Sequence, residues 1–309
     1  MIRRPRLFRR FLALLALYLV LCCLAGILVG EGAVHPQRRP LPPEAESIIR
    51  EIAATTNSEV RDGSIVTRDG KTLRASLLLP HASNGGAVIL LHGLSDNRLG
   101  MIGYAQLLTA HGYAVLLPDA RAHGASDSDL ATYGILERND IRQWFELLAL
   151  RVRPRCIFGL GESMGGAQLL QSLAVEPHFC SVIAESPFAS LREIAYDRVG
   201  QPLHLGPWFG RTVLRPAVEF AFVYVRLKYG LNVQCASPED VVAATSVPVL
   251  LIHGQIDSNI PLRHSLRIRS RNPNAAIWVV PSADHCGAIS TAPKEFQQRV
   301  FTWFSSHKS

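Results

Sequence analysis

The chain has 309 residues, 48% of them hydrophobic and 18% charged, which is enough for one sizeable core and unlike a disordered, collagen-like or disulfide-dense small protein. The formal net charge is +7, but the first ten residues hold five arginines, and residues 31–309 carry 27 basic and 25 acidic side chains. Because this body is nearly neutral, we expect no nucleic-acid partner.

The first expected element is a transmembrane helix. Residues 11–30, FLALLALYLVLCCLAGILVG, contain no charge, and as a helix they would measure about 30 Å, the thickness of a bilayer core. Residues 1–10 are basic and Glu31 is the first charge after the span, so the positive-inside rule predicts a cytoplasmic N-terminus. The body would then be extracytoplasmic, on the periplasmic side in a bacterium. The long apolar run without an A-x-A-like site favours an uncleaved signal anchor over a cleaved signal peptide.

Residues 31–56 are rich in Pro and charge and are predicted to be a linker that ends in a short helix. A hairpin around Asp69-Gly70 is expected to open a folded domain over residues 57–309. Short apolar runs follow at residues 87–91, 114–117, 156–160, 181–184, 247–252 and 277–280, and amphipathic stretches of helical length separate most of them. This alternation predicts an α/β fold, a mostly parallel sheet with helices on both faces.

About sixty residues separate the runs at 181 and 247, more than one crossover helix needs, so a small helical lid is predicted at about 187–240. Its segment 218–225, VEFAFVYV, is strongly apolar. We expect this segment to pack in a core, with a substrate-facing or membrane-facing surface as the open alternatives.

The stretch GLGESMGGAQ, residues 159–168, places Ser163 between two glycines, after an apolar strand and before a helical segment. This context is what a nucleophile elbow requires, since glycines allow a sharp turn that leaves the serine at the strand tip. A Gly-rich turn with an incidental serine is the alternative. The turn therefore predicts a nucleophile, provided that the chain also supplies a base and an acid.

Both partners occur later in the chain, each after a predicted strand. Asp257 follows residues 247–252, and His285 follows 277–280. The order Ser163, Asp257, His285 is that of α/β-hydrolases. Asp284 is a rival acid, but a carboxylate on the neighbouring residue is hard to aim at the imidazole.

An oxyanion hole is predicted from two backbone amides. His92-Gly93 ends an earlier strand, where the turn can present the N–H of Leu94, and Met164 directly follows Ser163. His92 itself precedes the serine and is given a structural role.

In these motifs and their order, the chain resembles the α/β-hydrolase superfamily over about residues 60–305. The resemblance is to single-domain serine esterases and peptidase-like members with a short lid in particular. The stretch DARAHGAS at 119–126 looks like the family's D-x-R-G-H-G-x-S loop, with Ala122 in place of a glycine. Tyr133-Gly134 with Glu137 and Asp140, and the HG-x-x-D array at Asp257 with Pro261, extend the match.

The resemblance implies a carboxylesterase-like serine hydrolase that cleaves an ester or other acyl bond through an acyl-enzyme. The alternatives are an acyltransferase or a peptidase with the same three residues, and a non-catalytic, membrane-tethered binding protein. A peptidase would need acidic groups on the lid, where Glu219 is the lone candidate. We expect a small acyl-ester substrate, the membrane as the other partner, and no metal or organic cofactor, since no ligand-spaced cluster or phosphate loop occurs. The oligomeric state is not predicted.

Four cysteines lie outside the predicted span. Cys156 opens one predicted strand and Cys180 precedes the next, so a disulfide is possible if the two strands are parallel neighbours. Two buried free thiols are the alternative. Such a bridge would persist in the oxidising compartment that the topology predicts. A bridge between Cys235 and Cys286 is less favoured.

Overall fold

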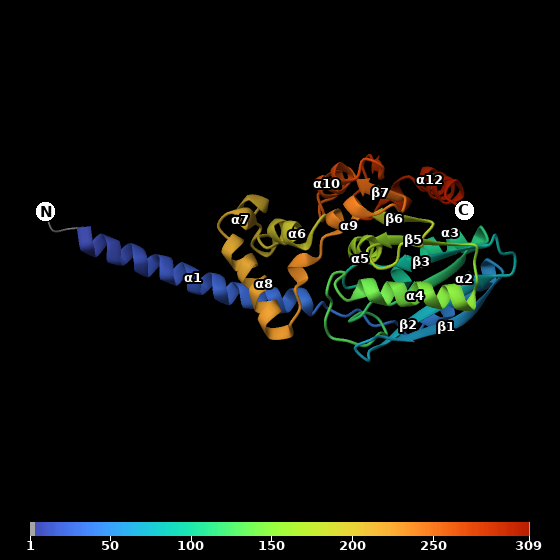
Figure 1. Ribbon diagram of the computed structural model, residues 1–309, viewed down its shortest axis with the longest axis horizontal. Helices are drawn as coiled ribbons and strands as arrows, with labels where there is room; N and C mark the ends of the chain where they lie inside the picture. The colour runs from blue at the N-terminus through green and yellow to red at the C-terminus, as the bar shows by residue number, and fades with distance from the viewer. Residues whose placement is uncertain (1–3, 309) are drawn as a thin grey trace.

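A computed structural model describes residues 4–308; Arg3, the first of the N-terminal arginines, lies outside the described residues. The chain forms a layered α/β body from which one long helix projects (Figure 1). This helix, α1 (Arg4–Val34), contains the predicted span and continues beyond it to Val34. Its segment Leu7–Val34 is long and apolar enough to cross a membrane.

The body is built on one eight-stranded sheet in the order β1-β2-β4-β3-β5-β6-β7-β8. The pairs β1–β2 and β2–β4 are antiparallel, and all other neighbours run parallel. The strands are β1 (Ser58–Val66), β2 (Thr72–Pro80), β3 (Gly86–Leu91), β4 (Ala114–Pro118), β5 (Cys156–Glu162), β6 (Ser181–Glu185), β7 (Val249–Gly254) and β8 (Ala276–Val280). This arrangement confirms the predicted fold class.

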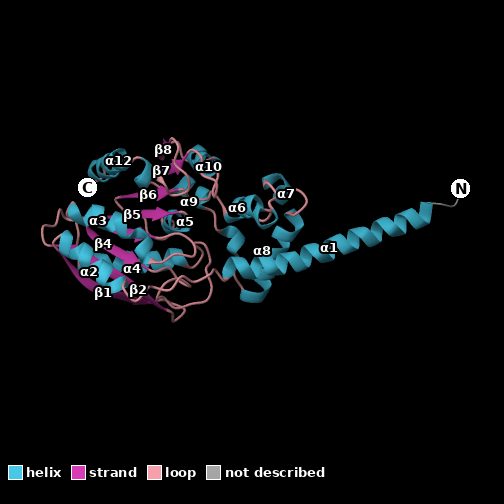
Figure 2. Ribbon diagram, turned by 180° about the vertical axis from the view of Figure 1, so that it is seen from behind, coloured by secondary structure: helices cyan, strands magenta, loops and turns pink. Residues whose placement is uncertain are grey.

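Helices cover both faces of the sheet, as Figure 2 shows. On one face lie α2 (Ala45–Thr55), α3 (Ile102–Ala110) and α12 (Pro293–Ser306), whose apolar side chains form one buried cluster with the strands. The other face carries α4 (Glu137–Arg151), α5 (Met164–Ser172), α9 (Pro238–Ala244) and α10 (Arg263–Arg271), which form a second cluster. The central strands are mostly apolar because both of their faces are buried.

Between β6 and β7 the chain leaves the sheet and forms α6 (Leu191–Arg198), α7 (Pro207–Arg211) and α8 (Arg215–Tyr229), in the region of the predicted lid. On α8, Val218, Phe222 and Val225 are buried. The buried carboxylate of Asp197 on α6 accepts a hydrogen bond from His264 Nε2 on α10, at 2.9 Å. The lid is thus fixed to the body by a buried polar contact as well as by apolar packing.

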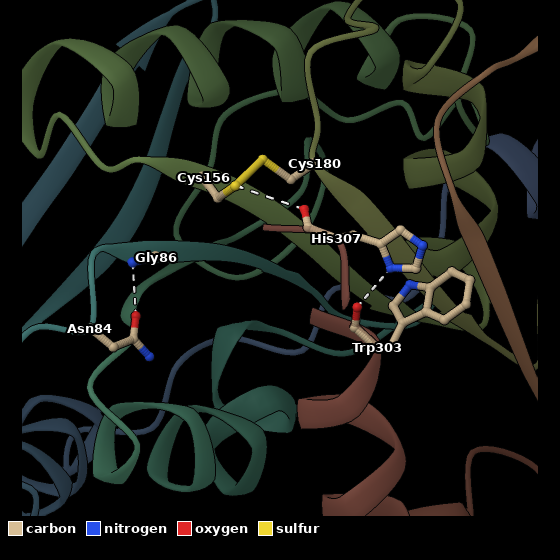
Figure 3. Close-up of a disulfide and its surroundings, with 6 residues drawn as sticks. All are labelled: Asn84, Gly86, Cys156, Cys180, Trp303 and His307. Atoms are coloured by element: carbon tan, nitrogen blue, oxygen red, sulfur yellow. Dashed lines mark hydrogen bonds between the residues drawn. A yellow bond between two sulfur atoms is a disulfide. The ribbon is translucent and has the colours of Figure 1, made fainter. Parts of the chain in front are cut away.

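Cys156, at the start of β5, and Cys180, directly before β6, form a disulfide with Cα atoms 5.8 Å apart. Figure 3 shows the bridge beside His307, at the end of α12. The strands β5 and β6 are parallel neighbours, which is the condition that the sequence analysis set for this disulfide. Cys235 and Cys286 are free thiols in the described structure, so the less favoured second bridge is absent.

Thiol titration checks the bridge. Of six cysteines, Cys22, Cys23, Cys235 and Cys286 are free, so the denatured, unreduced full chain should show four reactive thiols, and six after reduction. The bridge closes a loop with a sequence separation of 24, so reduction should lower the free energy of unfolding by about 3 kcal/mol. Six reactive thiols before reduction would contradict the bridge.

Candidate active site

Ser163 occupies the sharp turn between β5 and α5. Its backbone has φ 51° and ψ −116°, and residues with a Cβ rarely adopt such a positive φ. A Cβ at Gly161 would lie 2.7 Å from the backbone of Gly165, and one at Gly165 would lie 2.4 Å from Leu91 O. Both glycines are therefore required for the turn. Its geometry is held by a hydrogen bond from Ser163 N–H to Glu185 O on β6, at 2.8 Å.

The structure brings Ser163, His285 and Asp257 together in one hydrogen-bonded chain. His285 Nε2 lies 2.9 Å from Ser163 Oγ, and His285 Nδ1 lies 2.9 Å from Asp257 Oδ2. The three residues come from the loops at the carboxyl ends of β5, β7 and β8, where parallel strands meet at one edge of the sheet. Asp284, the rival acid, instead accepts hydrogen bonds from Ser258 and from the backbone N–H of His285.

The Asp257 carboxylate is buried and held in its charged form. Burial alone would raise its pKa, but hydrogen bonding from His285 and from the Ile260 N–H holds the pKa below its ordinary value. The Asn259 N–H donates to the same oxygen at 2.9 Å. An ionised Asp257 fixes the imidazole proton on Nδ1, which leaves Nε2 free to accept the Ser163 hydroxyl proton.

The two amides predicted for the oxyanion hole flank Ser163. Met164 begins α5, and the Leu94 turn is next to the serine, since a Cβ on Gly93 would lie 3.6 Å from Ser163 Cβ. Among the hydrogen bonds of the described residues, neither the Leu94 nor the Met164 N–H has a partner. Two unpaired amides beside a hydroxyl, one of them the first of helix α5, can hold a negative oxygen.

His92 and His123 brace the turn that carries Leu94. His92 Nε2 accepts a hydrogen bond from Ala120 N–H and His123 Nε2 accepts one from Ser95 N–H, both at 3.1 Å. Burial lowers the pKa of His92, and burial together with the neighbouring His92 lowers the pKa of His123 to about 4. Both rings are therefore neutral at physiological pH. Both ring nitrogens of His92 contact backbone groups, Gly93 O and Ala120 N–H, which agrees with a structural role.

One cluster that the sequence analysis did not find lies directly behind the nucleophile. The Tyr104 hydroxyl bridges two carboxyl groups, the half-buried Glu162 and the fully buried Glu185. Glu185 Oε1 also accepts the N–H of Ala288, three residues after His285, at 2.9 Å. Glu185 thus holds the Ser163 turn through its carbonyl and the His285 loop through its side chain. No sequence signal pointed to it, because a glutamate that ends a strand usually faces water.

The same cluster predicts a pH-dependent stability. Burial and the charge of Glu185 raise the pKa of Glu162 to about 8, from an ordinary value of 4.5. The folded protein therefore binds more protons than the unfolded chain between about pH 4.5 and pH 8, and its stability falls as the pH rises through this range.

Glu162→Gln removes this titration and keeps the shape of the side chain. We expect the variant and the unchanged protein to melt alike at pH 5, and the variant to be more stable at pH 9 by about 2 to 4 kcal/mol. Thermal unfolding of both proteins across this pH range measures the difference. Parallel stability curves would show that Glu162 is ionised throughout.

Among the described residues, no three His, Cys, Asp or Glu side chains gather in a group that could hold a metal ion. The chemistry that the arrangement offers is that of a serine hydroxyl, an imidazole, a carboxylate and two amides.

A mostly parallel eight-stranded sheet with a serine at the β5–α5 turn defines an α/β-hydrolase fold. The sequence profile of the "Alpha/beta hydrolase family" matches residues 88–298, and the chain belongs to this family. The uncharacterized protein YqkD of Bacillus subtilis is 29% identical over 239 residues, which are 75% of this chain and 74% of YqkD.

Solved structures agree on the fold. The Pyrococcus furiosus esterase Pf2001 superimposes with a TM-score of 0.69 at 22% identity, covering 90% of this chain and 99% of the esterase. The esterase RhEst1 from Rhodococcus sp. superimposes with a TM-score of 0.56 at 18% identity, covering 80% of this chain and 99% of RhEst1.

Proposed function

We propose that the protein is a membrane-anchored serine hydrolase that cleaves ester or other acyl bonds. The observation that carries this proposal is the hydrogen-bonded chain from Ser163 Oγ through His285 to Asp257, next to two unpaired amides. The two solved neighbours, Pf2001 and RhEst1, are esterases, which supports the same reaction class.

In the proposed mechanism, Ser163 Oγ attacks the acyl carbon while His285 Nε2 takes the hydroxyl proton. Asp257 orients the imidazole and stabilises its positive charge. The amides of Leu94 and Met164 hold the developing oxyanion. His285 then returns the proton to the leaving alcohol, the acyl group stays on Ser163, and a water activated by His285 releases the acid.

Among residues 4–308, no contact favours the peptidase alternative. Glu219, the one acidic candidate on the lid for binding a free amino terminus, is engaged by Arg192 at 3.1 Å and by the Tyr196 hydroxyl. Nor does any contact identify an acyl acceptor other than water. A non-catalytic binding protein would not require the hydrogen-bonded alignment of Ser163 with His285.

We further propose that α1 anchors the protein and that the body is extracytoplasmic. The exposed apolar side chains of α1 before Leu21 support the anchor, because an uncovered stretch of this kind is costly in water. The Cys156–Cys180 disulfide supports an oxidising compartment.

The apolar lid predicts a preference for apolar acyl groups of short to medium length. Met164, beside the nucleophile, belongs to the same buried cluster as Phe188, Ile194 and Phe222. Hydrolysis of p-nitrophenyl esters from acetate to octanoate by the purified full chain tests both the activity and this preference. We expect kcat/KM to rise from acetate before it declines; a steady fall from acetate onward would contradict the acyl preference, and no turnover of any ester would contradict the esterase.

A further inference from the structure

We propose that α7 and the N-terminal half of α8 lie inside the bilayer beside α1, from about its midplane into the outer leaflet, so that part of the lid is embedded in lipid. This inference rests on the membrane anchor of the proposed function, and not on the hydrolase reaction.

The contact between α1 and α8 has the form of membrane helix packing. Gly26 and Gly30 of α1 face Ala217 and Ala221 of α8. A Cβ at Gly26 would lie 2.7 Å from Ala217 O, so the two backbones approach directly. Small residues four apart on both partners allow this approach, which is how helices associate in a bilayer, where apolar side chains gain little from meeting one another.

Two polar contacts fix the direction of α8 along α1. Near the middle of the apolar run, the Tyr18 hydroxyl donates to Val213 O, just before α8, at 2.6 Å. At the far end of the run, Glu31 accepts hydrogen bonds from Tyr224 and Lys228 of α8, at 2.7 and 2.8 Å. The two helices therefore point in the same general direction and cross at an angle (Figure 1), and the start of α8 lies at the depth of Tyr18.

Helix length then decides where the lid lies. Only residues 11–17 separate the basic segment from the first lid contact at Tyr18, and seven helical residues measure about 10 Å against the roughly 30 Å of a bilayer core. With the lid wholly in water, α1 would be too short to cross. If residues 11–30 cross, the segments packed against residues 18–30 enter the membrane with them.

The surface of these segments suits that position. Trp208 is 63% exposed and Val213 43% exposed. Both arginines of these segments have a partner within the lid. Arg211 forms an ion pair with Asp197 at 2.9 Å, and the Arg215 guanidinium lies over the Tyr196 ring.

At the other end of α8, the charges and aromatic rings around Glu31 match a headgroup region. Lys228 lies between Tyr224 and Tyr229, and all three contact the Glu31 carboxylate. Tyrosines and lysines of this kind mark the membrane–water interface. Val34, at the end of α1, shares a buried cluster with Met164, so embedding the lid brings Ser163 close to the surface where amphiphilic esters concentrate.

Tryptophan fluorescence in vesicles tests the proposal on the full chain. The chain has four tryptophans: Trp144 and Trp278 are buried in the body, Trp303 is on α12, and Trp208 alone is in the lid. Phosphatidylcholine vesicles with bromine atoms on the acyl chains should quench part of the emission. Trp208→Phe should lose most of that quenching while it floats with the vesicles as the unchanged protein does.

A pair of glycine variants separates lid insertion from anchoring. Gly26→Leu should reduce the quenching of Trp208 by opening the α1–α8 contact, whereas Gly32→Leu should leave it unchanged, because nothing lies within 4 Å of a Cβ there. Equal quenching with and without Trp208 would overturn the proposal. So would a Trp208 shielded from both bromolipid and aqueous acrylamide, which would place a second copy of the chain on the lid. Protein that does not float would overturn the anchor and the insertion together, and ester hydrolysis, measured separately in detergent, would be unaffected by either failure.

Discussion

Ser163→Ala is expected to lower kcat/KM for a short p-nitrophenyl ester by about 10⁴-fold or more, because the nucleophile is lost while the fold remains. His285→Ala should have a similar effect, and Asp257→Asn a large one, because the asparagine no longer fixes the imidazole proton on Nδ1. Steady-state kinetics on purified variants with matched circular dichroism provide the measurement.

The double variant Ser163→Ala/His285→Ala sharpens this prediction. If the two residues act as one unit, it should be no slower than either single variant. Ser270→Ala, at an exposed serine on α10, serves as the matched control and should keep full activity. Multiplying losses in the double variant would mean that the two residues contribute independently.

The second large effect concerns stability. Asp119 is fully buried. Its carboxylate accepts hydrogen bonds from the Arg98 guanidinium at 2.8 Å and from the Arg98 backbone N–H at 2.7 Å. Asp119→Ala leaves Arg98 buried without its counter-charge, which should cost about 3 to 5 kcal/mol in the free energy of unfolding. The exposed pair Arg50–Glu46 is the control, and Glu46→Ala should cost less than about 1 kcal/mol.

Replacing both members of the buried pair tests the physical reason. Arg98→Met/Asp119→Leu should be more stable than Asp119→Ala alone, because no buried charge is left unpaired. Denaturant unfolding of the four proteins gives the comparison. A double variant less stable than Asp119→Ala would show that packing around Asp119, rather than the unpaired Arg98, determines the loss.

The sheet was predictable because its strands are short apolar runs bounded by loops, and the approach of Ser163, Asp257 and His285 followed from their places after three such runs. The loop 119–126 was also recognisable, although Ala122 replaces a glycine of the family pattern. In the structure Ala122 has φ 64°, so the alanine sits in the left-handed conformation that a glycine would adopt more easily.

Contacts between distant segments were not predictable. The apolar segment 218–225 indicated core packing, with a substrate-facing or membrane-facing surface as alternatives. In the structure, α8 buries Phe222 in the lid while Ala217 and Ala221 lie against α1. The sequence of α1 does not indicate that it packs against α8, and the sequence of α8 does not indicate α1. The buried Tyr104–Glu162–Glu185 cluster was missed for the same reason, because burial of a carboxyl group depends on strands that are far apart in sequence.

The central claim is that Ser163 is an activated nucleophile, and fluorophosphonate labelling tests it most directly. The full chain in detergent should react with the probe, and peptide mass analysis should find the adduct on Ser163. Ser163→Ala should abolish labelling, and His285→Ala should reduce it strongly, because the hydroxyl then has no base. Labelling that persists in Ser163→Ala, or an adduct on another residue, would contradict the account.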